Sequence, residues 1–140
     1  MPSDIPPDMR RLVAQRARNQ CEYCLLPEAA SLHRHEPDHI IPRQHGGETV
    51  ADNLALACFR CNKIKGPNVG SFDPLTGQLT PFFHPRLMLW GEHFVLEEGL
   101  IQPLSAEARV TVKIFRFNDD ARVLERQRLV ILGLYGKPSA

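Results

Sequence analysis

The sequence predicts a small α+β protein whose core is stapled by a metal site, and two observations lead to that prediction. Two Cys-x-x-Cys pairs, Cys21/Cys24 and Cys58/Cys61, enclose a segment in which short strand-like runs alternate with turn residues. Beyond this segment, hairpin-like and helix-like patterns continue toward the end of the chain. At 140 residues the chain can bury a modest core, and we expect residues 1–140 to form a single domain.

The composition indicates a folded globular protein without a strong charge bias. Hydrophobic residues make up 43% of the chain and charged residues 24%. The net charge of +1 gives no support for a strongly basic nucleic-acid binder, so any phosphate-binding surface must be local. The start of the chain lacks a basic region followed by an apolar run, and no window reaches the roughly 18 apolar residues of a membrane span. We therefore expect an unexported, cytoplasmic protein.

The four cysteines predict a structural zinc site. A two-residue gap lets a tight turn direct both sulfurs of a pair toward one tetrahedral ion. All four cysteines of the chain fall in the two pairs, Cys21/Cys24 and Cys58/Cys61. In a reducing cytoplasm such thiolates hold metal, and two disulfides or a redox pair are the alternative interpretation.

The elements around the cysteines are expected to be a helix, two strands and a second helix. Residues 6–20 predict a helix capped by Asp8, with arginines on its polar face that are either solvated or in contact with phosphate. Residues 32–41 predict a strand ended by Pro42, and residues 53–56 a second strand. A short helix over residues 58–65 should end at Gly66-Pro67.

The C-terminal half predicts a hairpin and two helices. Trp90 and Phe94 are candidate core residues, and residues 94–103 resemble a hairpin interrupted by Glu98-Gly99. Residues 105–117 alternate like a strand, but Ser105 and the alanines favour a helix. Asn118 or Asp119 should cap a final helix that runs to about Leu134. Its candidate core positions are Ala121, Leu124, Ile131 and Leu132.

Three residues between and beside the cysteines have the chemistry that one-metal phosphodiester hydrolysis needs: Asp38, His39 and Asn62. A carboxylate is a hard ligand that suits Mg²⁺ or Mn²⁺, and an imidazole can take a proton from water near neutral pH. Adjacent strand residues normally point to opposite faces. Asp38 and His39 could therefore serve one phosphate only if the strand is irregular or a helix folds across its edge.

These residues resemble the HNH endonucleases, which have the ββα-metal fold. The resemblance covers about a third of the chain. By that resemblance His39 is the general base, Asn53 holds the loop that positions His39, and Asp38 and Asn62 ligate a divalent ion such as Mg²⁺, Mn²⁺ or Ni²⁺. Asn62 stands where the family often has histidine, which makes this an HNN variant. The matching motifs are Asp38-His39-Ile40-Ile41-Pro42-Arg43, Gly46-Gly47, Asp52-Asn53-Leu54 and Cys58-Phe59-Arg60-Cys61-Asn62-Lys63-Ile64-Lys65-Gly66, framed by Cys21-Glu22-Tyr23-Cys24.

The resemblance implies a metal-dependent endonuclease that hydrolyses DNA. Residues 8–66 would form the zinc-bound nuclease core, and residues 67–140 a C-terminal α/β extension packed on it. The extension also resembles the tail of a bacterial HNH subgroup. The cationic side chains beside the site are expected to contact DNA phosphates: Arg43, Arg60, Lys63 and Lys65.

Two other functions remain open from the sequence. A non-catalytic Cys₄ zinc module could bind nucleic acid or protein, which the low net charge and Asn62 leave possible. A hydrolase that uses the Cys₄ zinc itself is disfavoured, because four thiolates leave no open coordination position.

Overall fold

A computed structural model describes residues 5–137, which form five α-helices and three separate two-stranded antiparallel sheets in an α+β fold. Among these residues, no helix has both the length and the apolar character needed to cross a bilayer. The helices and strands in chain order are α1 Pro7–Arg16, β1 Glu36–His39, β2 Leu54–Ala57, α2 Phe59–Lys65, β3 Gly70–Phe72, β4 Leu79–Pro81, α3 Trp90–His93, β5 Phe94–Glu97, β6 Leu100–Pro103, α4 Ala106–Ile114 and α5 Asp120–Ile131.

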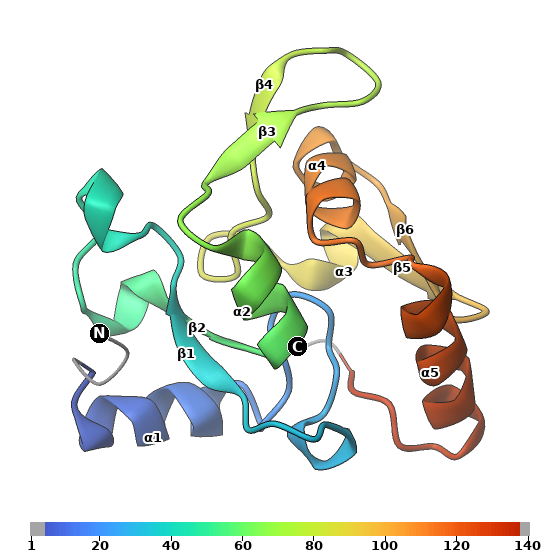
Figure 1. The fold of residues 1–140 in the computed structure, drawn as a ribbon, viewed down its shortest axis with the longest axis horizontal. Helices are drawn as coiled ribbons and strands as arrows, with labels where there is room; N and C mark the ends of the chain where they lie inside the picture. The colour runs from blue at the N-terminus through green and yellow to red at the C-terminus, as the bar shows by residue number, and fades with distance from the viewer. Residues whose placement is uncertain (1–4, 138–140) are drawn as a thin grey trace.

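The β1–β2 pair lies between two helices, α1 and α2 (Figure 1). The strands are antiparallel, and His39 lies opposite Leu54. Because side chains alternate along a strand, the two faces of β2 enter different hydrophobic clusters. Leu54 and Leu56 pack with Val13 of α1. Ala55 and Ala57 point to the other face and join the main core with the cysteines. Within residues 5–137 this sheet has two strands, and the outer edge of β1 has no partner strand among these residues.

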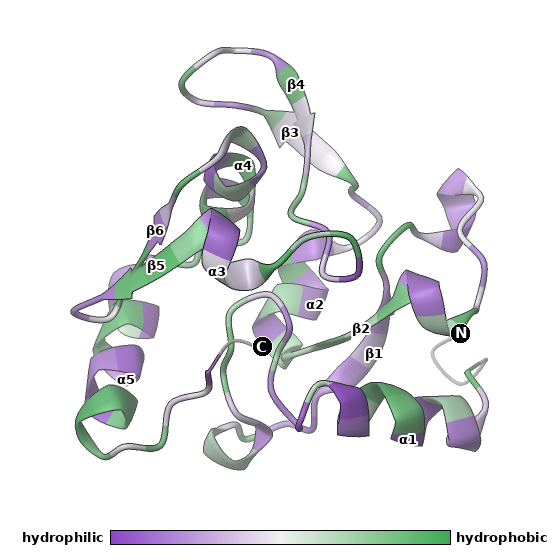
Figure 2. Cartoon of the chain, turned by 180° about the vertical axis from the view of Figure 1, so that it is seen from behind, coloured by the Kyte–Doolittle hydropathy of each residue, from purple (hydrophilic) through white to green (hydrophobic). Residues whose placement is uncertain are grey.

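Strands β1 and β2 differ in hydropathy and burial, and this difference leaves polar groups at the outer edge of β1. Hydrophobic residues fill β2, where all four positions are buried, whereas β1 is hydrophilic (Figure 2). A buried hydrophobic strand anchors the pair, and the hydrophilic strand can then present polar groups at its outer edge.

The predicted elements of the N-terminal half are confirmed in type and corrected at their ends. Helix α1 begins after an extended Pro6, and Asp8 lies in its first turn, so the prediction of Asp8 as the cap is wrong. Proline at the first helical position has no N–H to satisfy and a suitable φ angle. Strand β1 begins at Glu36 rather than near Leu32, which is fully exposed. Glu28 accepts a hydrogen bond from the His35 backbone N–H and holds the preceding residues in a loop.

In the C-terminal half the hairpin and both helices are confirmed. Strands β5 and β6 pair on either side of Glu98-Gly99, and Ser105 caps α4 by accepting a hydrogen bond from the Ala108 N–H. Trp90 and Phe94 are buried in the main core as predicted. Strands β3 and β4 form a further hairpin, which extends away from the rest of the fold in Figure 1.

The predicted core face of α5 is wrong. Leu124 is 47% exposed and Ile131 is 84% exposed, and the expected core positions Ala121 and Leu132 are exposed as well. The helix instead buries Arg122 and Arg126. Both guanidinium groups donate hydrogen bonds to backbone carbonyl groups of the preceding segments, such as those of Phe115, Phe117 and Gly99. These hydrogen bonds compensate for the burial of the two guanidinium groups. The prediction failed because it followed only the apolar residues of the helix.

Candidate active site and zinc centre

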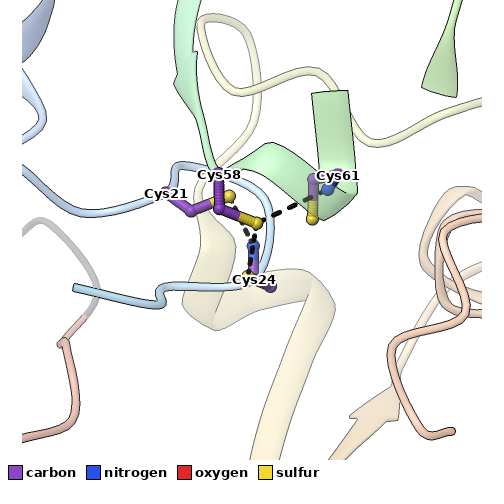
Figure 3. A group of neighbouring side chains, drawn as sticks. All are labelled: Cys21, Cys24, Cys58 and Cys61. Carbon is purple, nitrogen blue, oxygen red and sulfur yellow. Dashed lines mark hydrogen bonds between the residues drawn. The ribbon is translucent and has the colours of Figure 1, made fainter. Parts of the chain in front are cut away.

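The four cysteines meet at one point in the core. Their sulfur atoms lie within 4.8 Å of one another, and all four side chains are buried (Figure 3). The Cys24 and Cys58 sulfurs are 3.7 Å apart, close to the edge of about 3.8 Å expected for a tetrahedron with a metal–sulfur distance of about 2.3 Å. Cys58 also caps α2 by accepting a hydrogen bond from the Cys61 N–H. The donor set and its geometry fit a structural zinc ion.

Helix α5 places a positive charge against this cluster. The Arg122 guanidinium donates a hydrogen bond to the Cys61 sulfur at 3.3 Å. Burial lowers the pKa of the Arg122 guanidinium, but the negative charges of Cys61 and Cys24 outweigh burial and leave the pKa raised. Four thiolates around Zn²⁺ carry a net charge of about −2, so a buried cation stabilises them. The C-terminal extension thus contributes directly to the zinc centre.

A cleft of about 360 Å³ lies at the free edge of β1. Asp38 and His39 both line it, although they belong to opposite faces of the sheet. Asn62 reaches the cleft from α2, and Arg43 from the turn that follows β1. The edge of a two-stranded sheet is open to both faces, and α2 closes one side of it. This arrangement meets the condition under which neighbouring strand residues can serve one phosphate.

His39 is held through its imidazole ring. Its Nε2 atom is hydrogen-bonded to Thr49 Oγ1 at 2.9 Å, and the side chain is half-buried. Thr49 lies in the loop between β1 and β2, so the position of that loop affects the orientation of the imidazole. Sequence reasoning missed Thr49, because an isolated loop threonine carries no distinctive spacing.

Asn53 fastens the same loop to the end of β1. Its Nδ2 donates to the carbonyl oxygens of Ile41 and Glu48 at 3.0 and 2.9 Å, and its Oδ1 accepts from the Ile41 N–H at 2.9 Å. The loop passes so closely that a Cβ on Gly47 would lie 1.6 Å from the Ile41 carbonyl oxygen. One side chain therefore uses three hydrogen bonds to fix the segment that carries both His39 and Thr49.

Asp38 lies deeper than its neighbour. Its Oδ2 accepts a hydrogen bond from the Tyr23 hydroxyl at 3.1 Å and lies 3.2 Å from Lys65 Nζ. Burial raises the pKa of the Asp38 carboxyl, and the positive charge of Lys65 opposes that rise. Lys65 also donates a hydrogen bond to the backbone carbonyl of His39 at 2.9 Å. The two residues form a buried ion pair behind the cleft.

The four cations expected at DNA do not lie together. Lys65 is 1% exposed and its ammonium faces Asp38, so the expected phosphate contact by Lys65 is contradicted by its burial. Arg60 lies 3.5 Å from Glu125 of α5 and lines the cavities on that side of α2 rather than the cleft. Arg43 lines the cleft, and Lys63 is exposed on α2 with its ammonium over the Phe59 ring.

Two further residues lie near the site: Tyr23, for which the sequence indicated no role there, and Arg10, one of the helix arginines for which the sequence left phosphate contact open. Tyr23, between the first two cysteines, reaches Asp38 from the zinc knuckle. Arg10, on α1, lines the cleft beside His39. The burial of Lys65 could have been predicted from the sequence. Cys58, Cys61 and Lys65 are separated by three and four residues, so they lie on one face of a helix, and the cysteines place that face in the core.

The site thus combines a Cys₄ cluster that fits zinc with a polar cleft at the edge of β1, both within one ββα unit. Residues 21–68 match the family model described as HNH endonuclease, which confirms the resemblance seen in the sequence. The matched segment contains both cysteine pairs, β1, β2 and α2. No match was found among curated proteins or among solved structures.

Proposed function

We propose that the protein is a divalent-metal-dependent endonuclease that hydrolyses phosphodiester bonds in DNA. The observation that carries the proposal is the cleft at the edge of β1, where His39, Asp38 and Asn62 converge from two elements of the HNH segment. A catalytic imidazole, a carboxylate and a carboxamide are the groups that one-metal hydrolysis requires.

His39 serves as the general base in this proposal. His39 lines the cleft at the end of β1, and the hydrogen bond to Thr49 restricts rotation of its imidazole. Asn53 is a positioning residue, because it holds the backbone that follows His39 without lining the cleft itself. The imidazole accepts a proton from a water molecule, which then attacks phosphorus in line with the departing 3′ oxygen. The products are 5′-phosphate and 3′-hydroxyl ends.

Asp38 and Asn62 are the proposed ligands of the catalytic ion. Their oxygen donors suit Mg²⁺, Mn²⁺ or Ni²⁺, and both residues line the cleft on the α2 side. A carboxylate has about four lone-pair sites, so Tyr23 and Lys65 leave acceptor capacity on Asp38. When bound, the ion would stabilise negative charge on the phosphate and the leaving oxygen. The positive charge of Lys65 favours the ionised form of Asp38 and opposes the effect of burial, which raises the pKa of that carboxyl.

Arg43 and Lys63 are the proposed contacts to DNA phosphates. Arg43 lies at the cleft, and Lys63 is exposed on the helix that carries Asn62. Their charges are local, in keeping with a net charge of only +1 for the whole chain. Electrostatic attraction of this kind positions a nucleic acid without reading its sequence.

The buried ion pair favours a second candidate function, a non-catalytic zinc module that binds nucleic acid or protein. Lys65 already balances the charge of Asp38, so that carboxylate does not require a divalent ion for its neutralisation. In that case the cleft would hold a ligand phosphate but would not cleave it.

A plasmid-nicking assay distinguishes the two functions. Purified protein that retains one zinc per chain is incubated with supercoiled DNA and Mg²⁺, Mn²⁺ or Ni²⁺, with mild chelation as the comparison. The endonuclease proposal predicts nicked and linear products that require the added ion. DNA binding with no cleavage under any of the three ions would refute the proposal and support the zinc module.

A further inference from the structure

The three arginines of α1 have different surroundings. Arg16 is fixed inside the fold by hydrogen bonds to the carbonyl oxygens of Ala51 and Leu54. Arg11 is exposed and pairs with Asp8 on the same helix. Arg10 alone among the α1 arginines lines the cleft that contains His39. One basic helix thus carries a structural arginine, a surface arginine and an arginine at the candidate active site.

Arg10 approaches the cleft from the face of the sheet opposite α2. Helix α1 packs on the face that carries Leu54 and Leu56, and His39 pairs with Leu54 across the strands. Asn62 reaches the same cleft from α2 on the other face. A phosphate lying in the cleft would therefore have Arg10 and the imidazole on one side and the proposed metal ligands on the other.

Glu36 holds the guanidinium at the rim of the cleft. Arg10 Nη1 lies 3.5 Å from Glu36 Oε2, and their side chains are 32% and 47% exposed. An ion pair with this exposure contributes little stability and can be exchanged for another anion. A guanidinium can offer two parallel N–H donors to a phosphate, which makes phosphate a stronger partner than a solvated carboxylate at this distance.

The charges of the cleft make a further cation necessary. Glu36 and Asp38 both line it, and the charge of Glu36 would repel a phosphate, whereas Lys65 balances the charge of Asp38. The charge of Lys65 is directed toward Asp38 inside the fold, so Lys65 cannot contact DNA. Arg43 and Arg10 are the arginines that line the cleft among the described residues.

We propose that Arg10 binds the phosphate of the DNA strand undergoing hydrolysis, exchanging its contact with Glu36 for a contact with that phosphate. The inference rests on the proposed endonuclease function and adds a substrate-binding residue from outside residues 21–68, the segment that matches the HNH family. In this arrangement the N-terminal helix is part of the substrate site as well as a cover for the β1–β2 sheet.

The test compares Arg10→Gln with Arg11→Gln, which removes one charge from the neighbouring exposed position of the same helix. DNA binding is measured with a short fluorescent duplex in a His39→Ala background, in chelator that leaves zinc in place, across a range of salt concentrations. Loss of one phosphate contact should reduce the slope of log K against log salt by about 0.9 in Arg10→Gln. Arg11→Gln should keep the slope of the parent protein.

Cleavage measured with His39 present gives the second readout. Arg10→Gln should lower kcat/KM by about ten- to a hundredfold, as expected for loss of a charge-assisted contact to phosphate. Arg10→Lys should restore the salt slope but recover only part of the cleavage, because an ammonium lacks the paired donors. Thermal midpoint and zinc content show whether each variant is folded.

If the parent protein nicks plasmid DNA but Arg10→Gln and Arg11→Gln have the same salt slope and kcat/KM, the assignment of Arg10 is wrong and the endonuclease proposal stands. If the parent protein does not cleave DNA with any added ion, the endonuclease proposal fails and the role of Arg10 in that reaction fails with it.

Discussion

Replacing Lys65 by methionine tests the buried ion pair behind the cleft. Lys65 is 1% exposed, and its ammonium is 3.2 Å from Asp38 and 2.9 Å from the His39 carbonyl oxygen. Methionine fills similar volume but leaves Asp38 buried without its cation. Removing one partner of a buried pair costs about 3–5 kcal/mol, and protonation of Asp38 limits the cost to the lower end of that range. We expect Tm to fall by roughly 10 °C at pH 7 in excess zinc.

Calorimetry or circular dichroism measures this loss, and two variants control it. Lys63→Met removes a charge from the exposed face of the same helix and should change the free energy of unfolding by less than about 0.5 kcal/mol. The double variant Asp38→Asn/Lys65→Met removes both charges and should be more stable than Lys65→Met alone. If Lys65→Met is as stable as Lys63→Met, the ion pair does not stabilise the fold as inferred.

Three further predictions concern the loop, the zinc centre and the response to acid. Asn53→Ala removes three hydrogen bonds from the loop and should lower kcat about a hundredfold with zinc content unchanged. Arg122→Met removes the cation beside the Cys61 sulfur and should increase zinc release to a chelator about tenfold or more. The pKa of Asp73 lies well below its usual range because Arg109 donates two hydrogen bonds to it, so Arg109→Met should lower Tm at neutral pH.

The sign of the Asp73 effect follows from its lowered pKa. A carboxyl with a lowered pKa in the folded state stabilises the fold at every pH above its unfolded pKa of about 3.9. This contribution is lost as the pH falls from there toward the folded pKa. The Tm difference between the parent protein and Arg109→Met should therefore be constant from pH 6 to 8 and shrink below about pH 4. A difference that grows on acidification would contradict this assignment.

For Asn53→Ala and Arg122→Met, zinc content and activity should be measured on the same sample and compared with those of the parent protein. Full activity in folded Asn53→Ala would show that the loop keeps its position without the three hydrogen bonds. Unchanged zinc release from Arg122→Met would show that the thiolates do not depend on the charge of α5.

Local signals were sufficient for much of the fold. Glu98-Gly99 marked the β5–β6 turn, and Ser105 marked the start of α4, because caps and turns depend on residues only a few positions apart. The order of the HNH motifs likewise identified the segment that supplies most of the residues lining the cleft. Cys58 and Cys61 identified the zinc centre for the same reason, since their spacing is itself the geometric requirement.

Long-range electrostatics explain what sequence patterns could not predict. Arg122 and Arg126 are not part of the apolar pattern of α5, yet they are buried because Cys61 and distant carbonyl groups accept their hydrogen bonds. Lys65 looked like a phosphate contact, yet its partner is Asp38, which lies far away in the sequence. The type of a charged residue determines its chemistry. The fold determines whether its charge is paired in the protein interior or exposed at the surface.

Plasmid nicking by His39→Ala, compared with the parent protein and with His33→Ala, is the most direct test of the proposed active site. His33 is exposed, stacks on Phe59 and does not line the cleft, so it controls for loss of a histidine. With equal zinc content and Tm in all three proteins, we predict cleavage by the parent and His33→Ala and none by His39→Ala. Cleavage by His39→Ala at the rate of the parent would contradict the assignment of His39 as the general base.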